Sequence, residues 1–389
     1  MTTESADVDL RRRALLPAGL RDVLPPDAQH EAEALEQLIG CLRQNGYQRV
    51  KPPLLEFEDS LFSGPGAAMV GQTFRAMDPV SQRMMGVRAD MTVQAARLAA
   101  TRLFAAPRPL RLCYAGEVLR VAADQLNPER ELVQVGAELI GSDHLAADVE
   151  MIMLAVEALA AVGIEGVSVD ISVPTLVPLV CDHFGLAAPA GGPLRDALDH
   201  KDASQVASLA GAAGPLLTEL MLATGGADRC LATLAALELP ATARALIERI
   251  GHVLAAVRTA KPDLAVTVDP VENRGFEYYV GTCFSLFRAG VRGELGRGGR
   301  YLVAGNQAEP AFGFTLYMET LRRALPPPTT RRRLLIAASL SYADGAAWRA
   351  QGWATVKALD GEDDLRVEAR RLGCSHALID GAPVAVEQS

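Results

Sequence analysis

The sequence predicts an α+β protein with a large sheet of long antiparallel strands flanked by helices, a helical insertion, and a small α/β domain at its C-terminal end. Two apolar stretches, residues 110–122 and 131–141, suit adjacent antiparallel strands. Between the strand-like segments 167–172 and 264–270 lies an Ala- and Leu-rich stretch that predicts helices. Residues 326–330, PPPTT, predict a stiff linker, because proline can continue neither a helix nor a central strand.

Length and composition set the limits of the fold. A chain of 389 residues suggests two or three domains with enough apolar material for a core. No apolar run approaches the roughly 18 residues that span a bilayer, and the arginines near the start are not followed by an apolar stretch. We therefore expect a cytoplasmic protein that does not enter membranes. A net charge of −9 argues weakly against a broad phosphate-binding surface.

Local signals place the elements in order. The first predicted helix begins with Asp27 as its N-cap and ends at Asn45-Gly46. Residues 86–103 predict an extended piece that runs into a helix. After the pair of long strands, Ser142 or Asp143 is expected to cap another amphipathic helix.

These signals divide the chain into a core at residues 1–325, a helical insertion at about 175–262, the linker at 326–330, and a small α/β domain at 331–389. The six cysteines are widely spaced, without a CxxC pair or histidines at zinc-ligand spacing. We expect reduced, mostly buried thiols, no metal site and no cofactor. The cysteines are Cys41, Cys113, Cys181, Cys230, Cys283 and Cys374.

Several segments occur in the order typical of one enzyme family. Residues 45–62 resemble the dimer-forming first motif of class II aminoacyl-tRNA synthetases, 114–141 the second motif, and 313–321 the third. Residues 272–287 and the GRGGRY segment at 296–301 resemble two signatures of the histidyl enzyme. The chain is therefore similar to histidyl-tRNA synthetase, which implies a class II antiparallel sheet flanked by helices.

The resemblance also implies a histidine pocket. Free histidine needs acceptors for its ammonium, donors for its carboxylate, and a partner for its imidazole ring. Taken singly, a tyrosine pair in a strand is more typical of packing and an Asp-x-Thr of a helix cap. Inside the matching motifs, the implied ligands are Asp90, Thr92 and Gln134 for the ammonium, Arg274 with Gln134 for the carboxylate, Glu138 and Tyr279 for the imidazole, and Tyr278 for the wall.

Residue Asp90 stands where the synthetase family usually has glutamate. Its shorter side chain would require a bridging water or a shifted ligand.

The half of the site that would hold ATP is degraded. Arg120 remains at the position that contacts the α-phosphate in the synthetases, and it marks a vestigial ATP site. The acid and arginine that normally follow it are replaced, and a further basic position in the loop is now proline; the residues present are Val121, Ala122, Ala123 and Pro128. In the third motif Glu319 is followed by Thr320 instead of arginine, although Arg322 could substitute if the register shifts.

The segment GRGGRY lacks the lysine and the Ser or Thr of a P-loop, so we expect no nucleotide role for it. Its glycines are expected to permit tight turns of strands beside the pocket.

A retained histidine pocket, a lost ATP site and a short tail resemble the regulatory subunits of ATP phosphoribosyltransferase, which act at the first step of L-histidine biosynthesis. The resemblance implies a non-catalytic homodimer that binds histidine and assembles with a short catalytic subunit, with tRNA not expected as a partner. Two alternatives stay open, an active histidyl-tRNA synthetase and a stand-alone histidine or RNA sensor.

Overall fold

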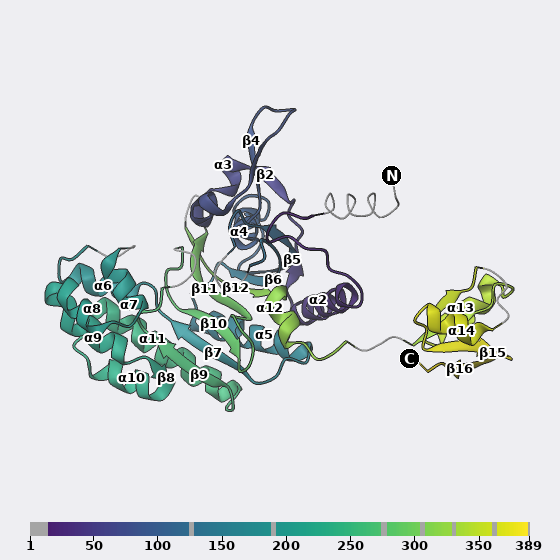
Figure 1. Ribbon diagram of the computed structural model, residues 1–389. Helices are drawn as coiled ribbons and strands as arrows, with labels where there is room; N and C mark the ends of the chain where they lie inside the picture. The colour runs from purple at the N-terminus through teal and green to yellow at the C-terminus, as the bar shows by residue number, and fades with distance from the viewer. Residues whose placement is uncertain are drawn as a thin grey trace, which may run out of the picture. The chain divides into compact units, whose positions relative to one another are not determined.

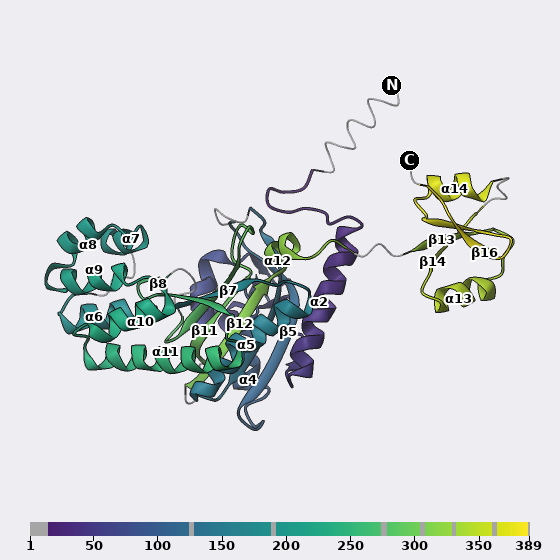
Figure 2. The same cartoon turned by 90° about the horizontal axis from the view of Figure 1, so that it is seen from below.

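The computed structural model describes residues 15–123, 128–187, 192–273, 278–303, 308–328, 332–359 and 364–387. The chain divides into two compact units, residues 1–326 and 327–389. Among the described helices, none is both long and apolar enough to cross a membrane. Figures 1 and 2 show the arrangement of the elements within the larger unit.

A nine-stranded mixed sheet forms the centre of the larger unit, in the order β1-β5-β6-β12-β11-β10-β7-β9-β8. The two expected long strands are β5 (Leu110–Leu119) and β6 (Glu131–Ile140), which pair antiparallel. Within this sheet, only the pairs β1–β5 and β7–β9 are parallel among the described strands. The remaining strands are β1 (Gln48–Arg49), β7 (Val167–Ser172), β8 (Gly225–Gly226), β9 (Ala265–Asp269), β10 (Cys283–Arg288), β11 (Gly296–Val303) and β12 (Glu309–Tyr317).

One face of the sheet is covered by helices. Helix α2 (Asp27–Gln44) and helix α5 (Leu145–Ala161) pack against each other and against β5, β6 and β12. Figure 2 shows both helices along the same side of the sheet. The sheet contributes buried residues at alternate positions to this core, including Cys113, Ala137, Phe314 and Phe284. Alternation along the strands leaves the other face free for a site.

Two helix starts differ from expectation. Asp27 is the first residue of α2, and Pro26 occupies the N-cap without a side-chain bond. Helix α5 is capped by His144, whose ring nitrogen accepts a hydrogen bond from the backbone of Ala146, and not by Ser142 or Asp143. Ser142 Oγ instead accepts from the backbone N–H of His144, so its hydroxyl bonds to the capping residue and not to the first turn of α5.

A smaller sheet, in the order β2-β4-β3, lies beside the main one and is built from β2 (Leu55–Phe57), β3 (Arg75–Met77) and β4 (Met84–Val87). It is accompanied by α3 (Glu58–Leu61) and the 3-10 helix η1 (Gly64–Gln72). Helix α4 (Thr92–Thr101) follows β4 and packs against β6 and β11. The first residues of α4 and the short stretch before it thereby reach the open face of the main sheet.

The insertion between β7 and β9 contains helices α6 (Leu176–His183), α7 (Pro193–Asp199), α8 (Ala203–Leu209), α9 (Gly214–Leu222), α10 (Ala227–Ala236) and α11 (Ala241–Ala260). It is not purely helical, because β8 lies between α9 and α10 and pairs with β9 at the sheet edge. Figure 1 shows this lobe beside the β7 and β9 end of the sheet. Helix α11 packs along α5, and the apolar core is continuous between insertion and sheet.

A buried ion cluster ties three elements together. Asp148 on α5 is fully buried and receives two bonds from Arg300 on β11, at 2.7 and 3.0 Å. Arg249 on α11 makes a second ion pair with Asp148. Because Arg300 also donates to the carbonyls of residues 142 and 144, it fixes the start of α5 on the sheet.

The smaller unit has a four-stranded sheet in the order β14-β13-β15-β16, formed by β13 (Arg333–Ile336), β14 (Ala354–Lys357), β15 (His376–Ile379) and β16 (Ala382–Ala385). Its helices are α13 (Tyr342–Ala350) and α14 (Leu365–Arg371). The last helix of the larger unit is α12 (Met318–Ala324), and residues 325–328 carry no helix or strand.

Replacing Asp148 with alanine should lower the free energy of unfolding of the larger unit by about 3–5 kcal/mol, because Arg300 would keep a buried, unpaired charge. Arg249→Ala should cost less, since the Arg249 side chain is 28% exposed and Asp148 keeps Arg300. Urea unfolding followed by far-UV circular dichroism measures both. Trp348 and Trp353, the chain's two tryptophans, lie in the smaller unit, so their fluorescence is an internal control that should not change. Equal losses of unfolding free energy in the two variants would contradict the conclusion that Asp148 is needed mainly to neutralise the buried Arg300.

Candidate functional site

The open face of the main sheet carries a carboxyl group in a row of glycines. Glu138 on β6 is opposite Gly313 on β12, and Gly313 is opposite Gly299 on β11. The next row on the same face contains Tyr114, Gly136 and Thr315. Side chains on one face of a sheet lie next to one another. Where a neighbour is glycine, no side chain fills the space, and an adjacent side chain can pack directly against the backbone of the sheet.

Position 313 must be glycine because the Glu138 carboxyl group packs directly against its backbone. A Cβ atom built there would lie 1.6 Å from Glu138 Oε2, which no packing can accommodate. At Gly299 the same construction meets Cys283 Sγ at 2.6 Å and the Tyr279 ring at 2.8 Å. The glycines of GRGGRY are therefore inside β11 and not in turns, contrary to expectation. Gly299 lets the Tyr279 ring lie against the sheet, whereas a Cβ atom at Gly298 would meet Phe284 and Phe314.

Glu138 is fully buried and is held by two tyrosine hydroxyls. Tyr114 on β5 donates to Oε1 and Tyr301 on β11 donates to Oε2, both at 2.9 Å. Burial raises the pKa of Glu138 to about 8, although the bonds from the hydroxyls act in the opposite direction. At neutral pH the carboxyl group of the unliganded protein is thus mostly protonated. It can share its proton with an incoming basic group.

Tyr114 is the centre of this network. Besides Glu138, its hydroxyl lies 3.0 Å from Thr92 Oγ1 and 3.0 Å from Thr315 Oγ1. One hydroxyl donates a single hydrogen and accepts up to two, so the donation to Glu138 leaves the two threonines as donors to Tyr114. The arrangement orients the Tyr114 hydroxyl toward the carboxyl group.

A second polar pair lies next to the first. Asp90 and Gln134 are both buried, and Gln134 Nε2 donates to Asp90 Oδ2 at 2.9 Å. Asp90 Oδ1 accepts from the backbone N–H of Thr92, and Gln134 Oε1 accepts from that of Met91. The start of α4 and strand β6 are therefore locked together, and a carboxylate and an amide are held side by side.

Tyr278 and Tyr279 form an aromatic wall that leads to Glu138. Their ring centroids are 4.8 Å apart, and the Tyr278 ring meets Tyr301 edge-on at 6.0 Å. Burial raises the pKa of both phenols, so both remain neutral donors. Arg274, expected at the ligand carboxylate, lies outside the described residues.

Six of the seven expected pocket residues are therefore described, and the hydrogen bonds and ring contacts connect them on one face of the sheet. Three side chains of the network were not predicted, namely Tyr114, Tyr301 and Thr315. Tyr114 lies within the second motif and Tyr301 at the end of GRGGRY, but only the strand register brings them to Glu138.

In the third motif, at α12, the polar side chains are buried or paired with other parts of the chain. Thr320 is fully buried in α12, and the adjacent Glu319 accepts from the backbone N–H of Val133 at 2.6 Å. Burial raises the pKa of Glu319 to about 7. Arg322, the expected substitute for a phosphate-binding arginine, makes ion pairs with Glu31 on α2 and with Glu129, both at 3.5 Å. It would have to leave both carboxylates to hold a phosphate.

The expected vestigial ATP position also has internal contacts. Arg120 forms a β-bridge with Thr73, and its Nε points to the carbonyl of Ala89 at 3.5 Å. The neighbouring Arg130 donates to the carbonyls of Arg120 and Ala18 and stacks on the Phe74 ring. Val121, Ala122, Ala123 and Pro128 are exposed and bring no charge.

No cluster of three or more His, Cys, Asp or Glu side chains suited to a metal is found in the described parts of the chain. All six cysteines are buried and unpaired.

The raised pKa of Glu138 predicts that the stability of the protein depends on pH. The group ionises near 4.5 when unfolded and near 8 when folded, so the unfolded state loses its proton first and stability falls as pH rises from about 5 to 8. The loss is on the order of 1.4 kcal/mol for each unit of pKa difference. Glu138→Gln removes this titration. Urea unfolding at several pH values should therefore give a steeper decline in wild type than in the variant, and parallel declines would rule out a raised pKa.

Comparison with known proteins agrees with this architecture. The family model described as histidyl-tRNA synthetase matches residues 19–321. The ATP phosphoribosyltransferase regulatory subunit of Rhodospirillum centenum is 53% identical over 93% of this chain and 94% of its own, and that of Paramagnetospirillum magneticum is 52% identical over 99% and 100%.

Solved structures show the same fold. A Bacillus halodurans protein titled ATP phosphoribosyltransferase regulatory subunit/histidyl-tRNA synthetase has a TM-score of 0.76 at 24% identity, covering 92% of this chain and 96% of its own. Histidyl-tRNA synthetase from Nostoc sp. has a TM-score of 0.71 at 18% identity, covering 95% and 91%. With a class II synthetase fold and relatives at half identity along almost its whole length, the chain belongs to the family of ATP phosphoribosyltransferase regulatory subunits.

Proposed function

We propose that this chain binds L-histidine in the Glu138 pocket, forms a homodimer through its class II core, and controls a short catalytic subunit of ATP phosphoribosyltransferase. Family membership gives it a regulatory and non-catalytic role in histidine biosynthesis. The single observation that carries the histidine assignment is the buried Glu138 carboxyl, held by two tyrosine hydroxyls at 2.9 Å beside a buried Asp90–Gln134 pair.

The chemistry of the pocket fits a small molecule with an ammonium group at one end and a basic ring at the other. Asp90 supplies a carboxylate for the ammonium, and Gln134 supplies both a donor and an acceptor. The Glu138 carboxyl can accept a ring N–H, and in its protonated form it can donate to a ring nitrogen. Imidazole is the amino-acid side chain whose protonation changes in the same pH range. The Tyr278 and Tyr279 rings would cover its faces.

The contacts of Thr320 and Arg322 argue against an active synthetase. Amino-acid activation needs cations at the phosphates as charge moves toward pyrophosphate. Thr320 is neutral and buried, and Arg322 is already paired with Glu31 and Glu129. A stand-alone histidine sensor would share the pocket, but the relatives at about half identity are named as subunits of an enzyme, which favours a catalytic partner.

Histidine affinity should depend on pH through Glu138. Near pH 7 the Glu138 carboxyl is mostly protonated and the imidazole of histidine is mostly neutral. The Glu138 proton can therefore be shared between the carboxyl and the ring, and binding takes up no proton from solvent. Above about pH 8 the empty carboxyl is ionised and affinity should fall. Below the imidazole pKa of about 6.5 the ligand carries an extra proton, and affinity should fall again.

Isothermal titration of wild type and Glu138→Gln with histidine from pH 5.5 to 9 tests this profile. The variant should bind less tightly at pH 7 and should lose the decline centred near pH 8. The ammonium of the ligand titrates identically in both experiments, so the difference between them isolates Glu138. Gly313→Ala, which displaces the Glu138 carboxyl, should abolish binding, while Gly251→Ala, in open space on α11, should not. Unaltered binding in Gly313→Ala would place the ligand elsewhere.

Mixing the purified chain with a short catalytic subunit should activate phosphoribosyl transfer, and histidine should inhibit the complex. Glu138→Gln should shift the inhibition curve to higher histidine concentration, because feedback requires differential affinity for active and inactive assemblies. Histidine-dependent ATP–pyrophosphate exchange by the chain alone should stay at background. Clear exchange would establish the synthetase alternative, and absence of any complex at micromolar concentrations would favour a stand-alone sensor.

A further inference from the structure

The residues between strands β1 and β2 are bonded to the segment that leads into helix α4. The backbone N–H of Arg88 donates to the carbonyl of Leu54 at 3.0 Å. The Arg88 guanidinium donates through Nη1 to the carbonyl of Pro52 at 3.1 Å, and through Nε to that of Glu117 on β5 at 2.6 Å. Arg88 is 5% exposed. The chain just before α4 is thus fixed to residues 52–54 and to β5.

Gln94 attaches α4 itself to the same stretch of chain. Its amide nitrogen donates to the carbonyl of Pro53 at 2.7 Å and to Glu56 Oε1 at 2.8 Å, so both hydrogens of the amide are used. Gln94 is 1% exposed. Glu56 Oε1 also accepts from Arg97 Nη2 at 2.5 Å, three residues later in α4. One buried amide therefore joins the helix to a backbone carbonyl and to a carboxylate.

The path from Gln94 to the candidate pocket is a single turn of helix. Thr92 is the first residue of α4, its Oγ1 lies 3.0 Å from Tyr114 Oη, and its N–H donates to Asp90 Oδ1 at 2.9 Å. The structure describes the chain without a gap over residues 15–123. Because residues two apart in a helix point to different sides, Gln94 holds α4 from a side other than the one that Thr92 presents to the pocket.

We propose that Gln94 is a positioning residue, through which residues 52–56 hold the start of α4 where Asp90 and Thr92 receive the ligand. The proposal rests on the proposed function, because it takes these two residues as the ammonium end of a histidine pocket. An ammonium group bound there needs its acceptors at hydrogen-bond distance, so a displaced first turn of α4 weakens binding. By linkage, histidine in the pocket favours the arrangement in which Gln94 holds residues 52–56.

A purely structural role for Gln94 would be to attach α4 to the rest of the protein. Other contacts also perform that task, because Ala96 and Ala99 of α4 pack in an apolar cluster with residues of β5, β6 and β11. The ion pair between Arg97 and Glu56 does not involve Gln94 either. Loss of the Gln94 amide should therefore leave the helix in place and loosen its first turn. Histidine affinity of the folded protein, and not its stability, separates the two roles.

The test compares wild type with Gln94→Met, Glu56→Gln and Thr224→Val in the full-length chain. Methionine has an unbranched side chain that cannot donate, so Gln94→Met removes both bonds and still fills the space. Histidine binding by titration calorimetry should weaken about tenfold, the change expected when a hydrogen bond to a charged group is lost. In Glu56→Gln the side-chain carbonyl still accepts from Gln94, so binding should stay within about twofold of wild type.

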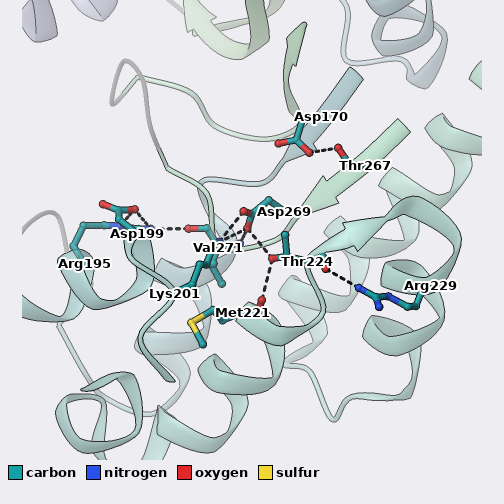
Figure 3. Close-up of polar contacts among 10 residues, drawn as sticks. All are labelled: Asp170, Arg195, Asp199, Lys201, Met221, Thr224, Arg229, Thr267, Asp269 and Val271. Atoms are coloured by element: carbon teal, nitrogen blue, oxygen red, sulfur yellow. Dashed lines mark hydrogen bonds and ion pairs between the residues drawn. The ribbon is translucent and has the colours of Figure 1, made fainter. Parts of the chain in front are cut away.

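Thr224→Val is the matched control, because the Thr224 hydroxyl also lies beside a backbone carbonyl and a carboxylate. It is 2.9 Å from the carbonyl of Met221 and 3.2 Å from Asp269 Oδ1 (Figure 3). Asp269 keeps Lys201, whose Nζ lies 2.8 and 2.7 Å from its two oxygens. These contacts join the helical insertion to the end of β9 and include no residue of α4 or of the stretch 52–56. Histidine affinity in this variant should stay within about twofold of wild type.

Hydrogen–deuterium exchange without histidine gives a second, independent measure. The backbone amides of Met91 and Thr92 both donate to side chains of the candidate pocket. They should exchange faster in Gln94→Met than in wild type, Glu56→Gln or Thr224→Val, because only Gln94→Met releases the first turn of α4.

The outcomes separate this proposal from the proposed function. Wild type that does not bind histidine would refute the proposed function, and the exchange result alone would then decide whether Gln94 positions α4. Unchanged exchange in Gln94→Met overturns the proposal, and so does faster exchange with unchanged histidine affinity. An equal loss of affinity in Thr224→Val or Glu56→Gln overturns it too. Should Gln94→Met not fold, Gln94→Asn, whose shorter side chain cannot reach both acceptors, is judged by the same criteria.

Discussion

The burial of the Glu138 carboxyl against a sheet is the constraint on which the site depends. A carboxyl group away from water is costly unless it is protonated or bonded. Here both conditions are met, because its pKa is raised to about 8 and two tyrosine hydroxyls donate to it. The side chain can lie flat only because Gly313 presents no Cβ beside it. One acidic group thus fixes the residue types on three neighbouring strands.

The two faces of the sheet perform different tasks for the same reason. Alternation sends Cys113, Ala137 and Phe314 toward α2 and α5, where they join the large apolar core. Their neighbours in sequence, Tyr114, Glu138 and Thr315, point to the opposite face and form the polar network. A stable core under the sheet lets the other face keep polar groups in fixed positions. Arg300 connects the two, since its strand carries Tyr301 and its side chain reaches Asp148 on α5.

Sequence was sufficient for the fold class, because motifs in a fixed order define the strands that carry them. It also named six described residues that hydrogen bonds and ring contacts connect on one face of the sheet. It failed where geometry depends on register or on competing local bonds. Tyr114 and Tyr301 meet Glu138 across strands, a relation that spacing along one segment does not contain. The glycines of GRGGRY were expected in turns but lie inside β11, where Gly299 lets the Tyr279 ring approach. Asp27 and Ser142 were expected as caps, but proline takes the first cap and His144 the second.

The polar groups beside Glu138 and the charged groups near the third motif are held in different ways. Beside Glu138, buried carboxyl, amide and hydroxyl groups bond mostly to one another. A phosphate site needs cations that are not neutralised internally. In this chain Arg322 is bound by Glu31 and Glu129, and Arg21 shares Glu129 with it. These ion pairs hold α2, α12 and the base of the second-motif loop together. The neighbouring Thr320 is neutral and fully buried. The role of these charges in the structure is to connect elements of the core, because each of these carboxylates and arginines is engaged with another part of the chain.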